Sequence, residues 1–334
     1  MSQATMQALI VESANAPFRP VQLPRPQAGP GEVLVRILAS GVNPLDTKIR
    51  AGNAAHARQL LPAVLGIDMA GVVEAAGPGV TGFAPGDEVF GMTGGVGGVQ
   101  GSLAEYAAVD ADLLARKPAG LSMRDAAALP LAFITAWEGL VDRARLQPGQ
   151  TVLVHGGAGG VGHVAVQIAR ALGAQVYATG SAASREVIEG YGATAIDFAT
   201  ATVERYVGQY TGGAGFDVVY DTVGGEVLDN AFLAARTYGG HVVSCLGWGT
   251  HKLAPLSLRA ATYSGVFTLI PLLTGRGRAH HGAILREAAR LAEAGKLAAR
   301  VDPRRFGLDN AIEAHHAIET GTARGKLVVE IAQS

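Results

Sequence analysis

The sequence predicts an α/β protein built from two different regions, and three observations support this. Before residue 122, glycine and proline separate short β-type runs, which is typical of irregular β structure. After residue 122, strand-like and helix-like segments alternate, which indicates βαβ units and a parallel sheet. Hydrophobic residues make up 49% and charged residues 16% of the 334 residues, so the chain can fill a sizeable core.

The first region is expected to be mostly β. Turn signals such as Gly29-Pro30-Gly31 and Pro85-Gly86-Asp87 separate its strands. A stretch with five glycines, residues 94–101, is expected to be a flexible loop. The predicted strands are residues 7–11, 32–38, 71–75 and 88–90.

The second region begins at Ser122, a suitable N-cap with Asp125 at the third helical position. A long helix at 280–295, a helix at 309–320 and a final strand at 325–331 follow its alternating part. The alternating strands are predicted at 151–155, 175–179, 216–221 and 241–245, and the helices at 160–172, 183–191, 201–210 and 225–235.

Composition narrows the possible partners and the compartment. A net charge of -1 without a long basic run argues against nucleic-acid binding. The single cysteine, Cys245, excludes an intramolecular disulfide and a cysteine-based zinc cluster, and it suits a reducing cytoplasm. The longest apolar segment, residues 126–137, is too short to cross a bilayer, and the first residues do not resemble a signal peptide. We therefore expect a cytoplasmic protein without membrane or nucleic-acid partners.

The strongest motif lies between the first strand and the first helix of the alternating part. Gly157, Gly159 and Gly162 form a GxGxxG pattern after an apolar strand, with Gly160 and Val161 inside it. The first glycine permits a tight turn, the second lets backbone N–H groups approach a pyrophosphate, and the third lets the helix pack closely on the strand. The helix N-terminus adds a favourable dipole for the anion. This context predicts a dinucleotide site.

The next strand indicates which dinucleotide is bound. An NAD site carries an acidic residue about 20 residues after the glycines, where it binds the ribose 2′-hydroxyl. Here no acidic residue lies between the glycines and Glu186, whereas Ser181, Ser184 and Arg185 could bind a 2′-phosphate. The sequence therefore favours NADPH; alternatively, these residues only cap and solvate the next helix.

Several segments together carry a resemblance to one known family: 41–52, 65–74, 85–89, 127–131 with 135–137, the glycine loop and 217–224. With these segments, the chain resembles the zinc-independent, zeta-crystallin-like quinone oxidoreductases of the medium-chain dehydrogenase/reductase superfamily. The resemblance covers essentially the whole chain. It implies a GroES-like, mostly β catalytic domain from residues 1–124 and 296–334, and a Rossmann domain with a doubly wound parallel sheet from residues 125–295.

The resemblance also implies roles for single residues. Asn43 and Thr135 would contact the nicotinamide, in a cleft between the two domains. Lys326 matches a C-terminal lysine common in relatives and is expected to bind the cofactor. A homodimer paired through the edge strands of the Rossmann sheets is the expected assembly. The adenine and ribose side would be lined by Asp221, Val223, Cys245 and Gly247.

No metal site is expected. By resemblance, Asn43 and Ile67 stand where zinc-dependent relatives have a Cys and a His, and neither side chain suits zinc. The adjacent pairs His280-His281 and His315-His316 are expected at the surface, because neighbours on a helix do not face one another.

Without zinc, the expected reaction is hydride transfer to a small acceptor that is already electrophilic, a quinone or an activated enone. Lys48 is the candidate donor to the developing oxyanion, and Asn43 would orient the nicotinamide or the substrate. Asp46 would orient Lys48; alternatively, Asp46 is a turn or cap residue and Lys48 an exposed loop lysine. Many relatives have a Tyr in place of Lys48, so two other functions stay open: reduction of alkenals and enones as the true role, and a non-catalytic NADPH-binding protein.

Overall fold

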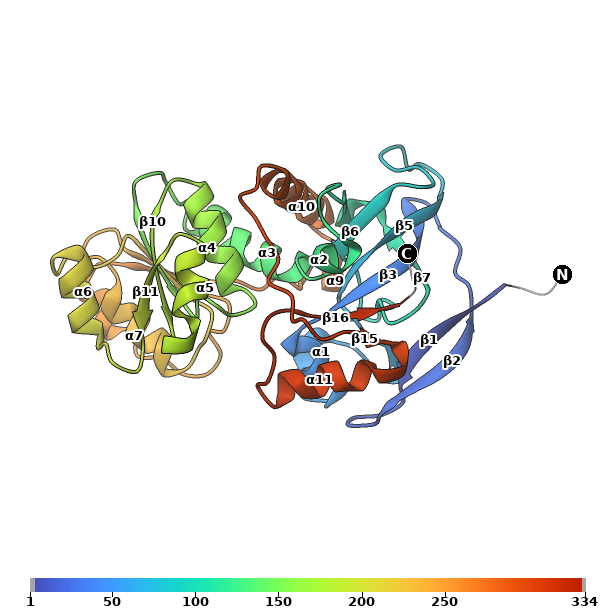
Figure 1. Cartoon of the computed structure of the whole chain (residues 1–334), viewed down its shortest axis with the longest axis horizontal. Coiled ribbons are helices and arrows are strands. Elements are labelled where there is room, and N and C mark those ends of the chain that lie inside the picture. The colour runs from blue at the N-terminus through green and yellow to red at the C-terminus, as the bar shows by residue number, and fades with distance from the viewer. Residues whose placement is uncertain (1–3, 332–334) are drawn as a thin grey trace. The chain divides into compact units, whose positions relative to one another are not determined.

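The computed structural model describes residues 4–331, which divide into two compact units (Figure 1). Of the described residues, unit 1 contains 4–131 and 269–331, and unit 2 contains 132–268. The chain passes from unit 1 into unit 2 within helix α3 (Pro130–Trp137). Segments from both halves of the sequence therefore build one unit.

Unit 1 is built on two β-sheets. The small sheet has the order β2-β1-β4, and the large one has the order β15-β16-β3-β5-β6-β8, with β7 also paired to β3. Strand β16 pairs antiparallel with the end of β3, so that Leu327 lies opposite Val42. The strands are β1 (Thr5–Val11), β2 (Phe18–Pro24), β3 (Glu32–Val42), β4 (Ala63–Val64), β5 (Asp68–Ala76), β6 (Glu88–Met92), β7 (Tyr106–Asp110), β8 (Leu114–Arg116), β15 (Phe306–Gly307) and β16 (Leu327–Glu330).

Strand β3 lies at the centre of the large sheet and supplies much of its core. Val33, Val35 and Ile37 alternate along it and are completely buried, as the two-residue period of a strand requires. They share a core with Met69 of β5 and Val89 of β6. The helices of unit 1 are α1 (Pro44–Arg50), α2 (Met123–Ala127), α9 (Ile270–Thr274), α10 (Arg278–Glu293) and α11 (Ala311–Glu319).

Unit 2 is a parallel six-stranded sheet with the order β11-β10-β9-β12-β13-β14. The first strand, β9, lies between β10 and β12, so the chain reverses its direction of winding there. Such a switch point leaves a crevice at the carboxyl ends of the strands, where open α/β sheets bind ligands. The strands are β9 (Thr151–His155), β10 (Gln175–Gly180), β11 (Thr194–Asp197), β12 (Val218–Asp221), β13 (His241–Ser244) and β14 (Thr262–Gly265).

Helices cover both sides of this sheet. Figure 1 shows α4 and α5 on one side of β10 and β11, with α6 and α7 on the other. A core that includes Phe216, Phe232 and Tyr206 fills the α6–α7 side. Besides α3, the helices are α4 (Gly162–Ala171), α5 (Arg185–Gly190), α6 (Val203–Thr211), α7 (Glu226–Ala234) and α8 (Ala254–Ser257).

The structure places the unit boundaries at 131/132 and 268/269, whereas the sequence suggested 124/125 and 295/296. The difference lies mainly in α10, which packs on unit 1. Arg278 forms an ion pair with Asp110 at 2.8 Å, and a Cβ on Gly282 would lie 2.5 Å from the carbonyl oxygen of Asp112. A 16-residue helix that follows a Rossmann pattern looks from its sequence like a further helix of that domain.

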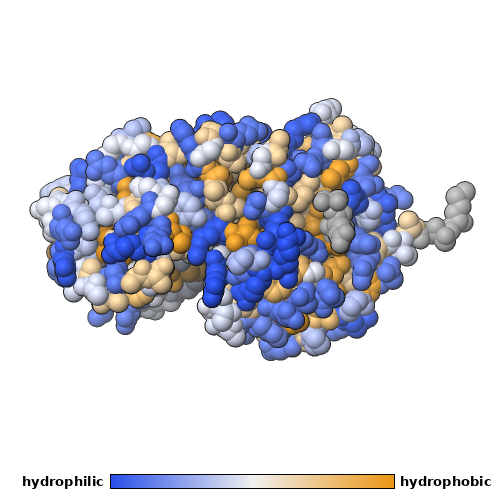
Figure 2. Space-filling model, in the orientation of Figure 1, coloured by the Kyte–Doolittle hydropathy of each residue, from blue (hydrophilic) through white to orange (hydrophobic). Residues whose placement is uncertain are grey.

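Hydrophilic residues occupy much of the surface seen in Figure 2, and hydrophobic residues are scattered among them. Within residues 4–331, no helix is long and apolar enough to cross a membrane. His281 and His315 are buried, which corrects the expectation that both histidine pairs lie at the surface. His315 packs edge-on against Phe18, and burial lowers its pKa to about 3.

Candidate cofactor site and buried polar cluster

The glycine loop, residues 157–162, connects β9 to α4 and packs so closely that two of its glycines leave no room for a side chain. A Cβ on Gly162 would lie 2.0 Å from the carbonyl oxygen of Gly156, and one on Gly157 would lie 2.5 Å from Cβ of Ala178 in β10. Helix α4 begins at Gly162, directly after Gly160 and Val161. The close packing assigned to the third glycine is therefore present, and the loop lies at the carboxyl end of β9, where a pyrophosphate would bind.

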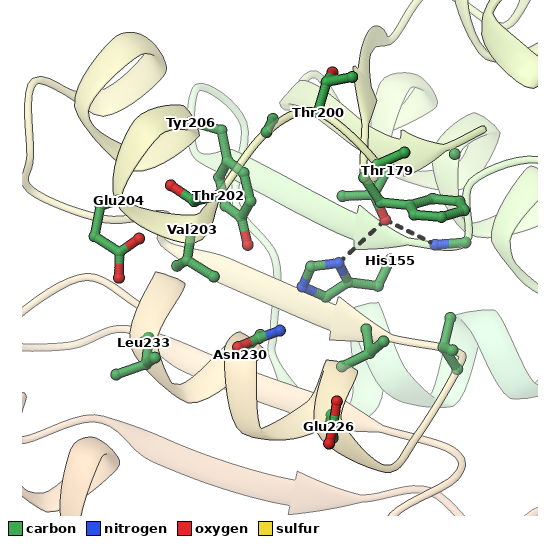
Figure 3. A pocket seen from close by; sticks show the side chains of 17 residues that line it. His155, Thr179, Thr200, Thr202, Val203, Glu204, Tyr206, Glu226, Asn230 and Leu233 are labelled. Carbon is green, nitrogen blue, oxygen red and sulfur yellow. Dashed lines mark hydrogen bonds between the residues drawn. The ribbon is translucent and has the colours of Figure 1, made fainter. Parts of the chain in front are cut away.

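A pocket of about 690 Å³ opens beside this loop, within unit 2 (Figure 3). Its walls come from the ends of β9 and β10, from the segment after β11, and from α6 and α7. Val223 is the residue among the predicted contacts that lines it. Phe198, whose surface is 64% exposed, offers an aromatic face at the pocket. The position at the switch point and the lining suit the adenosine part of a dinucleotide.

His155 contributes a buried polar group to the pocket. Its Nδ1 lies 3.2 Å from Oγ1 of Thr179, which also accepts a hydrogen bond from the N–H of Gly156 (Figure 3). Its Nε2 is buried and has no hydrogen-bond partner among the described residues. Burial lowers the pKa of His155 to about 4, against the opposing charge of Asp221, so the imidazole is neutral at pH 7. From the sequence, His155 was expected only to pack beside the glycine loop.

The three residues expected to bind a 2′-phosphate lie together after β10. Oγ of Ser181 and Oγ of Ser184 are 3.0 Å apart across a 3-10 turn, and α5 begins at Arg185. Arg185 Nη1 lies 3.1 Å from a carboxylate oxygen of Glu189, one turn later on the helix, and both side chains are about half exposed. These hydroxyls and this guanidinium could receive a phosphate, which would compete with Glu189 for the arginine.

The residues expected at the adenine and ribose side differ in exposure. The carboxylate of Asp221 is fully buried and accepts hydrogen bonds from the N–H groups of Val223 and Gly224 and from the hydroxyl of Ser244. Asp221 therefore shapes the turn after β12. Burial raises the pKa of the Cys245 thiol to about 12, so this thiol is not a nucleophile at neutral pH.

Gly247 and Thr135 each lie next to a tyrosine within unit 2. A Cβ on Gly247 would lie 2.1 Å from the hydroxyl oxygen of Tyr263, so this position cannot carry a side chain without rearrangement. Thr135 is buried in α3, and its carbonyl oxygen accepts a hydrogen bond of 2.6 Å from the hydroxyl of Tyr220. The hydrogen bond fixes the backbone at Thr135, whereas Tyr263 only leaves no room for a side chain at position 247. The cofactor contacts of both residues stay predictions.

In unit 1, Asn43, Asp46, Asp68 and Lys326 form a buried polar cluster. Lys326 Nζ donates to Oδ1 of Asn43 and, at 3.5 Å, to the carbonyl oxygen of Val42. Asn43 Nδ2 donates to Oδ2 of Asp68 at 2.9 Å, and the N–H of Asn43 donates to Oδ2 of Asp46 at 2.8 Å. Both functional atoms of the Asn43 amide therefore have protein partners.

Burial dominates the electrostatics of this cluster. Desolvation raises the pKa of Asp46 to about 7 and that of Asp68 to about 6, with the charge of Lys326 opposing both shifts. Desolvation also lowers the pKa of Lys326, which the two carboxylates oppose. Oδ1 of Asp46 is buried without a hydrogen-bond partner among residues 4–331. Three of these four residues were site candidates from the sequence. Asp68 lies in segment 65–74, which carries the family resemblance, but it was not singled out, because nothing in the local sequence shows that it meets Asn43.

Lys48 lies on α1, and its side chain is exposed. Asp46, by contrast, is 1% exposed and accepts from the N–H of Asn43, which caps the first turn of α1. The hypothesis that Asp46 orients Lys48 is therefore replaced by the alternative that Asp46 is a cap residue. The part that Lys48 plays in catalysis stays a prediction.

Two family models match the chain. Residues 29–119 match the alcohol dehydrogenase GroES-like domain, and residues 191–329 match a model described as zinc-binding dehydrogenase. Within residues 4–331, no group of three or more His, Cys, Asp or Glu side chains could hold a metal ion. The description of the second model therefore does not by itself supply a metal site to this chain.

Curated relatives include two reductases of similar sequence. The 2-methylene-furan-3-one reductase of Solanum lycopersicum is 37% identical over 307 residues, which are 89% of this chain and 71% of that protein. The chloroplastic NADPH-dependent alkenal/one oxidoreductase of Arabidopsis thaliana is 34% identical over 312 residues, 91% of this chain and 73% of that protein.

Solved structures give the same picture. An alcohol dehydrogenase superfamily protein from Novosphingobium aromaticivorans is 58% identical with a TM-score of 0.96, and the match covers 98% of this chain and 100% of the other. The quinone oxidoreductase from Coxiella burnetii is 28% identical with a TM-score of 0.82, over 98% and 100% of the two chains.

Proposed function

This chain belongs to the medium-chain dehydrogenase/reductase superfamily, and we propose that it is an NADPH-dependent reductase of enones and quinones that works without zinc. One observation carries the proposal: a glycine loop closed to side chains connects β9 to α4 beside a pocket of about 690 Å³ at the switch point of the sheet. This is where a Rossmann sheet binds a dinucleotide.

The choice of NADPH over NADH rests on the segment after β10. This strand ends at Gly180, and Ser181, Ser184 and Arg185 follow before the first acidic residue, Glu186. A phosphate gains charge-assisted hydrogen bonds from hydroxyls and a guanidinium, whereas the acid that binds a free 2′-hydroxyl is missing. The Arabidopsis relative named above is also NADPH-dependent, which supports this choice.

The residues at the position of the superfamily's catalytic zinc do not fit that metal. Asn43 accepts a hydrogen bond from the Lys326 ammonium and donates one to Asp68, so its amide is already occupied. Ile67 is completely buried and has no ligand atom. We therefore derive no step through a metal.

The chemistry that remains is reduction of an activated double bond. When bound, NADPH supplies a hydride for the electrophilic carbon of the acceptor. The negative charge then develops on the acceptor's oxygen, and a proton completes the product. Exposed Lys48 is the proposed donor to that oxygen, with water as the alternative proton source. Because both named curated relatives reduce enones or alkenals, we place these ahead of quinones as substrates.

The test is turnover of NADPH and NADH by the purified protein with an alkenal, an enone and a benzoquinone. We expect NADPH to be consumed with at least one acceptor, and much faster than NADH. Tight NADPH binding without turnover of any acceptor would support the alternative of a non-catalytic binding protein. Absence of NADPH binding would overturn the proposal altogether.

A further inference from the structure

The polar cluster of unit 1 contains a continuous chain of hydrogen bonds. It begins at Lys326, whose Nζ donates to Oδ1 of Asn43. Asn43 Nδ2 then donates to Oδ2 of Asp68 at 2.9 Å. Oδ1 of Asp68 accepts from the N–H of Leu131 at 2.9 Å. Four segments distant in sequence, from the residue just before β16 to the first turn of α3, are therefore joined through three side chains.

The order of donors and acceptors in this chain admits one arrangement. An ammonium can only donate, so the Asn43 atom beside Lys326 must be the amide oxygen. The amide nitrogen then faces Asp68, whose carboxylate accepts on both oxygens. Lys326 thus determines which way the Asn43 amide points, and Asn43 determines which oxygen of Asp68 is left for Leu131.

The last member of the chain supports the beginning of a helix. Pro130 and Leu131 open α3, and the first N–H groups of a helix have no partner within it. The Asp68 carboxylate satisfies one of them and adds a favourable charge at the positive end of the helix dipole. Helix α3 continues into unit 2 and carries Thr135, the expected nicotinamide contact.

Because its side chains are buried, the hydrogen-bond chain depends on every one of them. Asn43 is 1%, Asp68 0% and Lys326 6% exposed, so water cannot replace a missing partner. Removing one partner of a buried charge pair leaves the other charge uncompensated and is strongly destabilising. Removing the charges of Lys326 and Asp68 together leaves no uncompensated charge. A variant without both charges therefore separates the effect of an unbalanced carboxylate from the effect of losing the Lys326 side chain.

We propose that Lys326 is a positioning residue that acts through Asn43 and Asp68 on the first turn of α3, and that it does not contact the cofactor. This inference rests on the proposed function only where it concerns NADPH; the hydrogen-bond chain itself is independent of what the protein binds. It changes the role that the family resemblance implies for Lys326, from a cofactor contact to the support of a helix.

The experiment compares Lys326→Met with the charge-balanced variant Asp68→Asn/Lys326→Met. In the double variant, the amide oxygen introduced at position 68 can still accept from the Leu131 N–H. The amide nitrogen introduced there can donate to Oδ1 of Asn43, once the Asn43 amide has flipped. The readouts are hydrogen–deuterium exchange of the peptide covering residues 129–137 and the Kd for NADPH. We expect the single variant to exchange about tenfold faster and to bind NADPH more weakly, and the double variant to regain most of both.

Lys117→Met is the matched control. Its side chain is also buried in unit 1, at 4% exposure, where Nζ lies 3.0 Å from Glu88 and donates to the carbonyl oxygens of Pro118 and Leu121. This variant loses a buried ammonium but should leave exchange at 129–137 unchanged.

Two results would overturn the proposal. Wild-type exchange at 129–137 in Lys326→Met would show that the chain does not support α3. Restored exchange in the double variant without restored NADPH binding would show that Lys326 contacts the cofactor directly. If the protein binds no NADPH at all, the proposed function fails, and the exchange measurement still decides whether Lys326 supports α3.

Discussion

Arg185 gives the most direct residue-scale test of cofactor choice, because its guanidinium already faces a carboxylate. Arg185 Nη1 lies 3.1 Å from Glu189 at a half-exposed position. A 2′-phosphate would offer a stronger charge-assisted partner. We expect Arg185→Ala to weaken NADPH binding about tenfold or more, with NADH nearly unchanged, measured by titration of cofactor fluorescence.

Glu189→Gln is the companion variant for this measurement. It removes the carboxylate that competes for Arg185, so NADPH affinity should stay the same or increase. Equal losses of NADPH and NADH affinity in Arg185→Ala would contradict the phosphate assignment, because the arginine would then serve the fold of α5 and not the 2′-phosphate.

Lys48 is exposed on α1, which sets the size of the effect we expect from it. A preorganised oxyanion donor in a dry site contributes about 10²–10³ in turnover, whereas water can partly replace an exposed one. We predict that Lys48→Ala lowers kcat about tenfold with little change in NADPH affinity. Lys252→Ala, at another exposed position, should leave kcat unchanged. A wild-type kcat in Lys48→Ala would make positioning alone the source of catalysis.

The raised pKa of Asp46 predicts how the stability of the protein depends on pH. This pKa rises from 3.8 to about 7 on folding, so the folded state holds a proton that the unfolded chain releases. The stabilisation is complete below pH 3.8 and is lost as pH rises toward 7. Asp46→Asn keeps an acceptor for the Asn43 N–H, so it should raise the melting temperature at pH 8 more than at pH 4. An equal change at both pH values in thermal denaturation would disprove this.

At the scale of elements, the junction between β9 and α4 depends on Gly162. A methyl group there would lie 2.0 Å from the carbonyl oxygen of Gly156, so α4 would have to move away from the loop. We expect Gly162→Ala to destabilise the protein by about 2 kcal/mol or more and to weaken NADPH binding, measured by denaturant unfolding and cofactor titration.

Gly208→Ala is the control for this effect. Gly208 lies inside α6, and a Cβ there would meet no atom within 4 Å. The same substitution should stabilise α6 by about 0.5–1 kcal/mol, because alanine loses less backbone entropy than glycine in a helix. If Gly162→Ala were equally harmless, the close approach at the glycine loop would not matter for the fold.

The elements that could be predicted from the sequence are those with strong periodicity or a motif. Strand β9 is confirmed at its predicted bounds, and the helix after the glycine loop is confirmed with a later start. Strands β11 and β14 were missed, because they are less buried than β12 and β13, which have the same length of four residues and were predicted. Parallel pairing with β10 and β13 holds these strands, and a local pattern does not record such long-range pairing.

In the candidate site, too, residues of a local motif could be predicted, and residues brought together by long-range strand pairing could not. The glycine loop is a local motif and could be identified directly. His155 and Phe198 enter the pocket only because β9 and β11 end at the same edge of the sheet. Asp68 and Lys326 are 258 positions apart in the sequence and meet through the pairing of β16 and β5 with β3. Such contacts require the topology and cannot be derived from spacing.

At the scale of the whole molecule, β14 is the strand through which we expect two copies to pair. It is the last strand of the six-stranded sheet, and Thr262 and Gly265 on it are exposed. Nearby, Leu258 and Tyr238 are 84% and 79% exposed. An open strand edge next to apolar side chains favours association, and a two-fold axis would join the two sheets edge to edge.

Pairing across a two-fold axis brings equivalent residues of β14 close together, which makes the dimer sensitive to a single charge. We expect wild-type protein to have twice the 34.1 kDa chain mass in light scattering after size exclusion. Thr262→Lys would place like charges near each other along the shared edge, so its mass should fall toward that of the monomer. Gln209→Lys, at an exposed position of α6, adds the same charge away from the edge and should remain dimeric. A Thr262→Lys dimer as stable as wild type on dilution would mean that the copies pair through another surface, because an edge-to-edge sheet cannot accept paired lysines without loss of affinity.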